Sequence, residues 1–193
     1  MENMLDFIKS KRSIRRYKKE QIKDSELNQI LEAGLWAPNA GSKQFPIFLV
    51  SQDEIVNWKL GVINRKLFVN TITDEVNYVS KQQPSIADLS SIKTAFYSAP
   101  TVITIFAPDN YLYTKEDCAV AATSMSIMAW SLGIGSCYVS RADETFKTEY
   151  GKELMKKAGI DETYTAITHL LLGYPDGEIG EGKPRKYDRI KHI

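Results

Sequence analysis

The chain has 193 residues, of which 43% are hydrophobic and 25% charged, so it can bury the core of one domain but hardly of two. Lys and Arg number 25 against 24 Asp and Glu, and the resulting net charge of +1 excludes the overall positive field that nucleic-acid binders usually carry. No apolar run has the length of a bilayer span, and the N-terminus lacks the order of a secretory signal, so we expect a cytoplasmic protein without a membrane partner.

The sequence offers few candidates for metal or thiol chemistry. Its two cysteines, Cys118 and Cys137, match no metal or redox spacing and lie beside small or apolar residues, so we expect buried, reduced thiols. His169 and His192 are the only histidines, which argues against a histidine-rich metal centre. We therefore predict no bound metal.

Hydrophobic spacing and chain breakers predict the elements of the first half. Apolar residues recur at helical spacing behind the possible caps Asp24 and Ser25, and Pro38 requires that helix to stop. The expected order is a short amphipathic helix at 5–9, a basic stretch at 10–19, this second helix, a small and polar loop at 37–46, a strand at 47–51 and a helix at about 53–70.

The second half begins with a polar stretch of poor periodicity at about 70–92, which we expect to form a partly ordered lid or insertion. Pro100 introduces the β-branched run TVITIFA, which suits a central strand. The next helix has small residues on most sides and can pack closely against several partners, including another chain. The elements expected from there are a helix at 115–133, a strand at 134–139, a charged helix at 144–158, a strand at 166–175 and a glycine-rich tail at 176–193.

This order of elements predicts a single domain over residues 1–193, of the α+β or mixed α/β class and with three layers. Neither an internal repeat nor a low-complexity tract interrupts it.

The basic stretch SKRSIRRYKK, residues 10–19, is the first candidate binding segment. Arg12, Ser13 and Arg15 supply two planar guanidinium forks and a hydroxyl, a set that can hold one terminal phosphate. The stretch is also compatible with a solvated basic face, a membrane-surface helix or a nucleic-acid module. The last two are disfavoured, because the stretch has few apolar residues and no aromatic stacking platform is recognisable.

The loop APNAGSKQFP, residues 37–46, is the second candidate. Its small residues let backbone amides approach a ligand closely, and Asn39, Ser42 and Gln44 can hydrogen-bond to one. A third segment, LGIGSC, combines a helix C-cap at Gly133 with the start of a buried strand.

Five segments in the same order resemble the nitroreductase family of flavoproteins. They are R-S-x-R with an aromatic residue behind it, a helix ending in APNAGSKQ, the strand segment YSAPTVITIF, the helix segment DCAVAATSMSIMAWSLGIGSCYV, and LLLGYP followed by KPRK. The resemblance spans nearly the whole chain. It implies a three-layer α/β/α sandwich with a mixed central sheet and flanking helices, in a homodimer that binds each FMN between its two chains.

The resemblance also implies which residues bind FMN. Arg12, Ser13 and Arg15 match the family's N-terminal flavin motif, and Arg185 matches a distant arginine that shares the phosphate. The tail at 176–193 is expected to reach the partner chain. In the family, a loop of the partner chain contacts the flavin ring, and the residues that match this loop are Pro38, Asn39, Ala40, Ser42 and Gln44. The residues that match a turn beside the ring are Ser136 and Cys137.

The activity that the resemblance implies is NAD(P)H-driven, ping-pong reduction of nitroaromatics, quinones or related small electrophiles through flavin N5, without a catalytic side chain. Arg15 and Lys43 are the candidates for a positive group near flavin N1 and O2. The alternatives on the same scaffold are enone reduction, dehalogenation and flavin fragmentation. A further alternative is a protein that is not an enzyme and that binds flavin for storage or sensing, without turnover.

Overall fold

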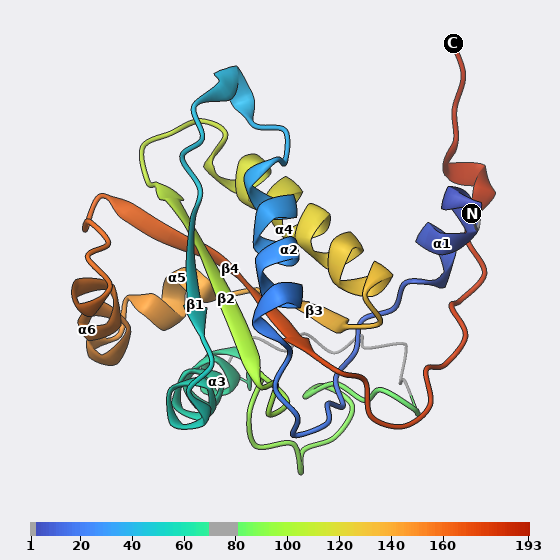
Figure 1. Cartoon of the computed structure of the whole chain (residues 1–193), viewed down its shortest axis with the longest axis horizontal. Coiled ribbons are helices and arrows are strands. Elements are labelled where there is room, and N and C mark those ends of the chain that lie inside the picture. Colours follow the sequence, from blue (N-terminus) through green and yellow to red (C-terminus); the bar gives the residue numbers. More distant parts are fainter. Residues whose placement is uncertain (1–2, 70–80) are drawn as a thin grey trace.

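A sheet of four strands forms the centre of the molecule in a computed structural model, which describes residues 3–69 and 81–193. The strands lie in the order β1-β2-β4-β3, so the two longest occupy the middle and the two shortest the edges (Figure 1). Their bounds are Ile47–Ser51 for β1, Thr101–Pro108 for β2, Gly135–Val139 for β3 and Tyr164–Gly173 for β4.

Every pairing between these four strands is antiparallel, which corrects the expectation of a mixed sheet. The described residues contain one parallel pairing, an isolated bridge between Ser13 and Ser136 at the edge of β3. The sequence segments predicted strands but not their directions, because direction depends on how the connecting helices cross the sheet.

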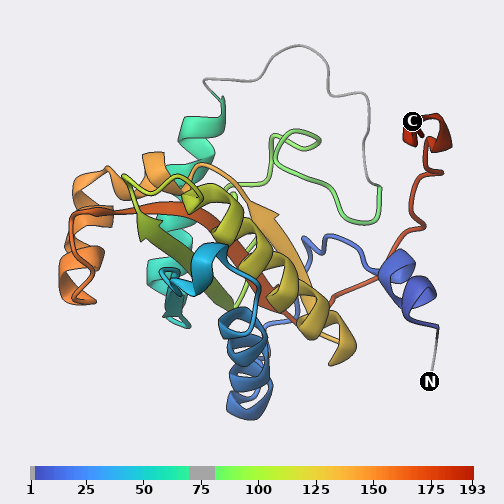
Figure 2. The same cartoon turned by 90° about the horizontal axis from the view of Figure 1, so that it is seen from above.

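Helices cover both faces of the sheet, which confirms the three layers (Figures 1 and 2). The helices α2 and α4 lie on one face, while α3, α5 and α6 lie on the other, and α1 stands apart beside the C-terminal tail. The bounds are Met4–Ser10 for α1, Asp24–Leu35 for α2, Glu54–Val69 for α3, Thr114–Ser131 for α4, Ala142–Phe146 for α5 and Glu149–Lys157 for α6, with single 3₁₀ turns at Ala40–Ser42 (η1) and Tyr187–Arg189 (η2).

The central strand β2 supplies both halves of the core. Ile103 and Ile105 point to the face covered by α2 and α4, whereas Val102 and Phe106 belong to the cluster under α3 and α5. All four side chains are at most 1% exposed. Burial on both faces explains why the sequence of this strand is apolar at nearly every position instead of alternating.

Two helix boundaries differ from the expectation. The N-cap of α2 is Lys23 and not Asp24 or Ser25, since the Glu26 carboxylate accepts a hydrogen bond from the Lys23 N–H at 2.9 Å. The charged segment at 144–158 is not one helix. It breaks at Thr148, which caps α6 by accepting a hydrogen bond from Gly151 N–H at 3.3 Å.

The proposed lid at about 70–92 is only partly described. Residues 70–80 lie outside the described residues, and 81–92 form turns without a helix or strand. The tail beyond β4 is extended apart from the turn η2, and it runs back to α1 (Figure 2). Across the described ranges, no helix combines the length and the apolar character that crossing a membrane requires.

Candidate functional site

A cavity of about 360 Å³ lies where the N-terminal basic stretch meets the C-terminal tail. Five cationic side chains line it against one carboxylate, so its electrostatic character is strongly anion-attracting. The lining residues are Lys11, Arg12, Ser13, Arg15, Gln83, Gly180, Glu181, Gly182, Lys183 and Arg185. The fold therefore brings the four residues predicted for the phosphate, Arg12, Ser13, Arg15 and Arg185, into one site.

The sheet edge fixes the N-terminal segment in this cavity. Ser13 bridges to Ser136 of β3, and the Ile14 N–H donates to the Ser136 carbonyl at 2.9 Å. The Ile14 side chain is fully buried and lies directly on Gly135, where a Cβ atom would come 2.7 Å from the Ile14 Cβ. The glycine before Ser136 is thus needed for the close approach of the two segments.

Arg12 has a buried nitrogen that no described residue satisfies. Its Nη1 donates to the carbonyls of Lys9 and Lys11, at 2.5 and 2.8 Å, but its Nε is buried and has no acceptor among the described residues. The guanidinium lies against Gly182, and a Cβ atom at that position would overlap Nη2. An unsatisfied guanidinium nitrogen beside a glycine is a donor set that fits a phosphate group.

Arg15 is held from the other side of the cavity by the segment that follows residue 80. Its Nη1 donates to the Gln83 carbonyl at 3.2 Å. Burial lowers the pKa of Lys11, and the charge of Arg15 lowers it further, although Cys137 acts in the opposite direction. A bound anion would relieve the repulsion between these cations, so the site has an electrostatic reason to take one.

Ser136 and Cys137 lie beneath the cavity and do not line it. Ser136 has no exposed surface, and its hydroxyl is 2.7 Å from the hydroxyl of Ser126 on α4. Cys137 is 2% exposed, and burial raises the pKa of its thiol, so it is not a reactive thiolate. Within this chain, both residues contact the N-terminal segment that lines the cavity, Ser136 through its bridge to Ser13 and Cys137 through Arg15.

The loop at 37–46 lies elsewhere, around η1 at the end of α2 (Figure 1). Two residues outside the loop hold Ala40 by hydrogen bonds. The Ala40 N–H donates to Asp117 Oδ1 at 3.0 Å, and the Tyr111 hydroxyl donates to the Ala40 carbonyl at 3.0 Å. The residues Pro38, Asn39 and Gln44 line a separate cavity of about 80 Å³, whereas Ala40 and Ser42 line neither cavity.

One chain therefore does not bring the loop residues together with the basic cavity. Three residues that the structure links to these sites were not expected from the sequence: Lys11, Gln83 and Asp117. Lys11 adjoins the predicted motif and could have been included on charge alone. Gln83 lies in a stretch without periodicity, and Asp117 is in the first turn of α4, where an acidic residue has a sufficient local explanation in the helix dipole.

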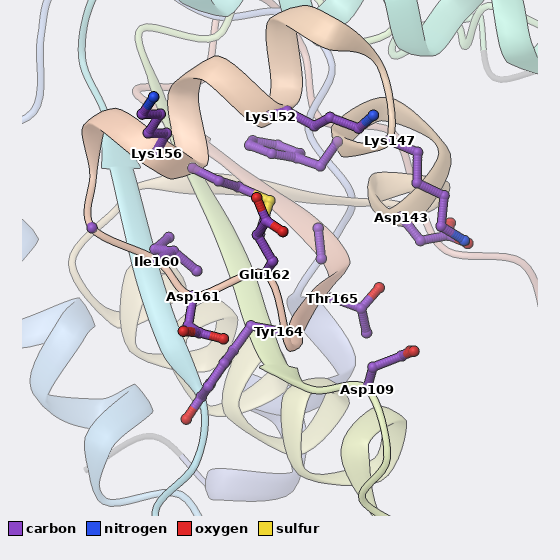
Figure 3. A pocket seen from close by; sticks show the side chains of 14 residues that line it. Asp109, Asp143, Lys147, Lys152, Lys156, Ile160, Asp161, Glu162, Tyr164 and Thr165 are labelled. Carbon is purple, nitrogen blue, oxygen red and sulfur yellow. The ribbon is translucent and has the colours of Figure 1, made fainter.

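A larger cavity of about 700 Å³ lies between α5, α6 and the start of β4, far from the basic site (Figures 1 and 3). Its floor is apolar and its rim carries both signs of charge. Lys147 and Asp143 lie together at its edge, with 3.8 Å between Nζ and Oδ2. Nothing in this mixed rim selects a ligand class.

The residues described by the structure contain no group of three or more His, Cys, Asp or Glu side chains that could hold a metal ion. His169 is fully buried in β4, between the rings of Phe96 and Phe146, and its Nδ1 lies 2.8 Å from Thr104 Oγ1. Burial lowers its pKa to about 3, so it is a neutral core residue.

An antiparallel sheet between two helix layers, with a basic cavity lined by both ends of the chain, defines an α+β protein with a candidate anion site. The family described as "Nitroreductase family" matches residues 8–174. The chain belongs to the nitroreductase family.

Individual relatives agree with this assignment. The chain is 27% identical over 178 residues, 92% of its length and 88% of the relative's, to a protein of Archaeoglobus fulgidus named "Putative NADH dehydrogenase/NAD(P)H nitroreductase". Among solved structures, it superposes at a TM-score of 0.82 and 25% identity on a nitroreductase with bound FMN from Bacteroides fragilis, covering 100% of both chains. A nitroreductase with bound FMN from Desulfitobacterium hafniense gives the same TM-score and coverage at 22% identity, which supports the fold.

Proposed function

We propose that the protein is an FMN-dependent oxidoreductase that takes electrons from NAD(P)H. The observation that carries the proposal is the convergence of Arg12, Arg15 and Arg185 on one cavity in a chain of this family. The names of its relatives, which refer to bound FMN and to NAD(P)H nitroreductases, support both the cofactor and the electron donor.

The phosphate of FMN is the part of the cofactor that the basic cavity fits. Arg12 offers its unsatisfied Nε, Ser13 lies exposed with its hydroxyl, and Arg185 is an exposed residue whose Nη1 donates to the Lys183 carbonyl at 2.9 Å. Charge-assisted hydrogen bonds to a phosphate are about twice as strong as neutral ones. The chain contributes affinity and orientation, and FMN supplies two-electron chemistry when bound.

The proposed reaction is the reduction of nitroaromatics, quinones or related small electrophiles, with NAD(P)H and the acceptor using the same place in turn. No side chain is assigned a catalytic role. Arg15 and Lys43 remain the candidates for the positive group near the flavin pyrimidine ring, where a positive charge stabilises the developing negative charge.

We also propose that the working unit is a homodimer in which the loop of one chain completes the site of the other. Two features support it: the loop residues lie apart from the basic cavity of their own chain, and α1 buries none of its residues. The exposed apolar side chains of the tail, including Tyr187 and Ile190, fit a segment that reaches the partner, as proposed for 176–193.

The test is the absorption spectrum of the purified protein, before and after denaturation. We expect a yellow protein that releases FMN and not FAD, because the cavity suits one terminal phosphate. Anaerobic addition of NADH or NADPH should bleach the flavin, and a nitroaromatic or quinone should restore the colour. A colourless protein that does not bind added FMN would contradict the proposal, and a flavin that NAD(P)H does not bleach would favour storage or sensing.

A further inference from the structure

Gln83 is a buried polar residue in the described turns that follow residue 80. Its side chain is surrounded by protein, with 4% of the residue exposed, and it lines the basic cavity. A buried amide must have its hydrogen bonds satisfied, so the partners of Gln83 indicate what it holds in place.

The amide oxygen of Gln83 holds the N-terminal basic segment. Oε1 accepts from two consecutive backbone amides, Arg15 N–H at 2.7 Å and Arg16 N–H at 2.9 Å. The Gln83 carbonyl also accepts from Arg15 Nη1 at 3.2 Å. One residue thus restrains both the backbone and the guanidinium of Arg15.

The amide nitrogen of Gln83 holds the C-terminal tail. Nε2 donates to the carbonyls of Glu178, at 3.2 Å, and Asp176, at 3.5 Å. The same stretch of tail bonds directly to the basic segment, because the Asp176 N–H donates to the Arg16 carbonyl at 2.9 Å. The tail then continues to Gly182 and Arg185 on the wall of the cavity.

We propose that Gln83 is a positioning residue for the cofactor phosphate: it sets the distance between the arginines of the N-terminal segment and the arginine of the tail. The inference rests on the proposed function. Both hydrogens and both lone pairs of the amide are engaged by protein groups, so Gln83 acts through the arginines and does not bind the phosphate itself. A single side chain thereby joins the two segments that supply the cations of the cavity.

The test compares Gln83→Met with Gln82→Met. Methionine keeps the length of the side chain and removes the four side-chain hydrogen bonds described above. Gln82 is the same residue type at the preceding position and is exposed to solvent. Affinities for FMN and for riboflavin, which lacks the phosphate, are measured by flavin fluorescence. We expect Gln83→Met to weaken FMN about tenfold and riboflavin by less than about twofold, with Gln82→Met unchanged.

The ratio of the two affinities separates positioning from general destabilisation, which would weaken both flavins together. An unchanged ratio in Gln83→Met would overturn the inference. Where Gln83→Met does not fold, Gln83→Asn takes its place, because it keeps an amide that is one methylene too short to reach both segments, and the same change in ratio is expected.

Amide hydrogen exchange in the flavin-free protein gives a second readout. The Arg15 and Arg16 N–H groups should be protected in the parent and in Gln82→Met, and should exchange faster in Gln83→Met. A parent that binds no FMN would refute the proposed function, and exchange at these two amides would then still decide whether Gln83 holds the segment. Unchanged exchange would refute the positioning role alone.

Discussion

The Arg12 guanidinium lies against the backbone of Gly182, close enough that a Cβ atom at residue 182 would overlap Nη2. The two residues stand near opposite ends of the chain, and both line the basic cavity. Gly182 does not have a positive φ, so alanine is compatible with its backbone. Only the end of a flexible side chain would have to move.

Gly182→Ala should therefore separate cofactor binding from folding. We expect an unfolding free energy within about 0.5 kcal/mol of the parent, the usual range for surface substitutions, and an FMN affinity that falls because the Arg12 guanidinium is displaced. The checks are urea unfolding and flavin titration. Gly180→Ala is the control, because it adds a Cβ to the same cavity wall, where that atom would meet the end of the Gln82 side chain and not Arg12. Equal FMN affinity in both variants would contradict the phosphate role of Arg12.

Arg12→Ala and Arg185→Ala should each weaken FMN by about 1.5 to 3 kcal/mol, the range for hydrogen bonds to charged groups. Riboflavin should bind these variants as it binds the parent. Arg189→Ala is a matched control, because Arg189 is an exposed arginine of the same tail that lies outside the cavity lining. If all three variants hold FMN equally, the basic cluster is only a solvated face.

Lys11 predicts a pH dependence of FMN binding. Its pKa is lowered chiefly by burial, so it loses its proton at a lower pH than an ordinary lysine. The cavity then loses one positive charge, and FMN affinity should fall as the pH rises towards and through that lowered pKa, by ~1 kcal/mol. The FMN-to-riboflavin affinity ratio measured from neutral to alkaline pH tests this. Lys11→Met should bind FMN more weakly at neutral pH and lack the alkaline fall.

His169 predicts that the stability of the fold depends on pH in the acid range. Its pKa falls from 6.5 in the unfolded chain to about 3 when folded, so the unfolded chain binds the proton first as the pH drops. The folded state should lose stability below about pH 6.5, on the order of 3 kcal/mol by pH 4. Urea unfolding across this range should give a slope that His192→Gln keeps and His169→Gln reduces, while carboxyl groups with lowered pKa values, such as Glu26 and Asp161, account for a remaining slope at the acid end. A parent without the slope would show that His169 is not buried and neutral.

The proposed homodimer predicts that dilution releases flavin together with the partner chain, because both equilibria are linked by mass action. Light scattering and flavin fluorescence across a dilution series measure the two. A variant truncated after Lys186 keeps Arg185 and removes the exposed apolar residues Tyr187 and Ile190, so it should dissociate at higher concentration. A monomer with stoichiometric FMN would refute the shared site.

Strong local signals made most of the fold predictable. Pro38 and Gly133 end their helices close to the expected positions, and the strand at 47–51 has the expected bounds. The break at Thr148 was not predicted, because a capping threonine inside a charged run does not disturb the helical spacing around it. The expected mixed sheet was also wrong, since the pairing of strands is a property of distant segments.

The residues of the basic cavity were predictable where they belong to one sequence motif, and unpredictable where they are brought there by tertiary contacts. Arg12, Ser13 and Arg15 are neighbours in sequence, and their meeting with Arg185 followed from the family resemblance. Nothing local marks Gln83, whose partners lie at both ends of the chain. The same holds for Asp117, whose Oδ1 bonds to Ala40 in a loop of another segment.

The hydrogen bonds that hold Ala40 have a consequence for the entropy of ligand binding. Ser42 and Gln44 both have a positive φ, of 51° and 52°, a backbone region that such residues rarely adopt in a free loop. The bonds of Ala40 with Asp117 and Tyr111 anchor the start of this turn, and the Gln44 N–H donates to Asn39 Oδ1 at 2.9 Å, so the cost of the conformation is met when the chain folds and not when a ligand arrives. In the proposed homodimer, a loop that is already fixed would lose little conformational freedom on contacting the flavin ring, and flavin binding would be correspondingly more favourable.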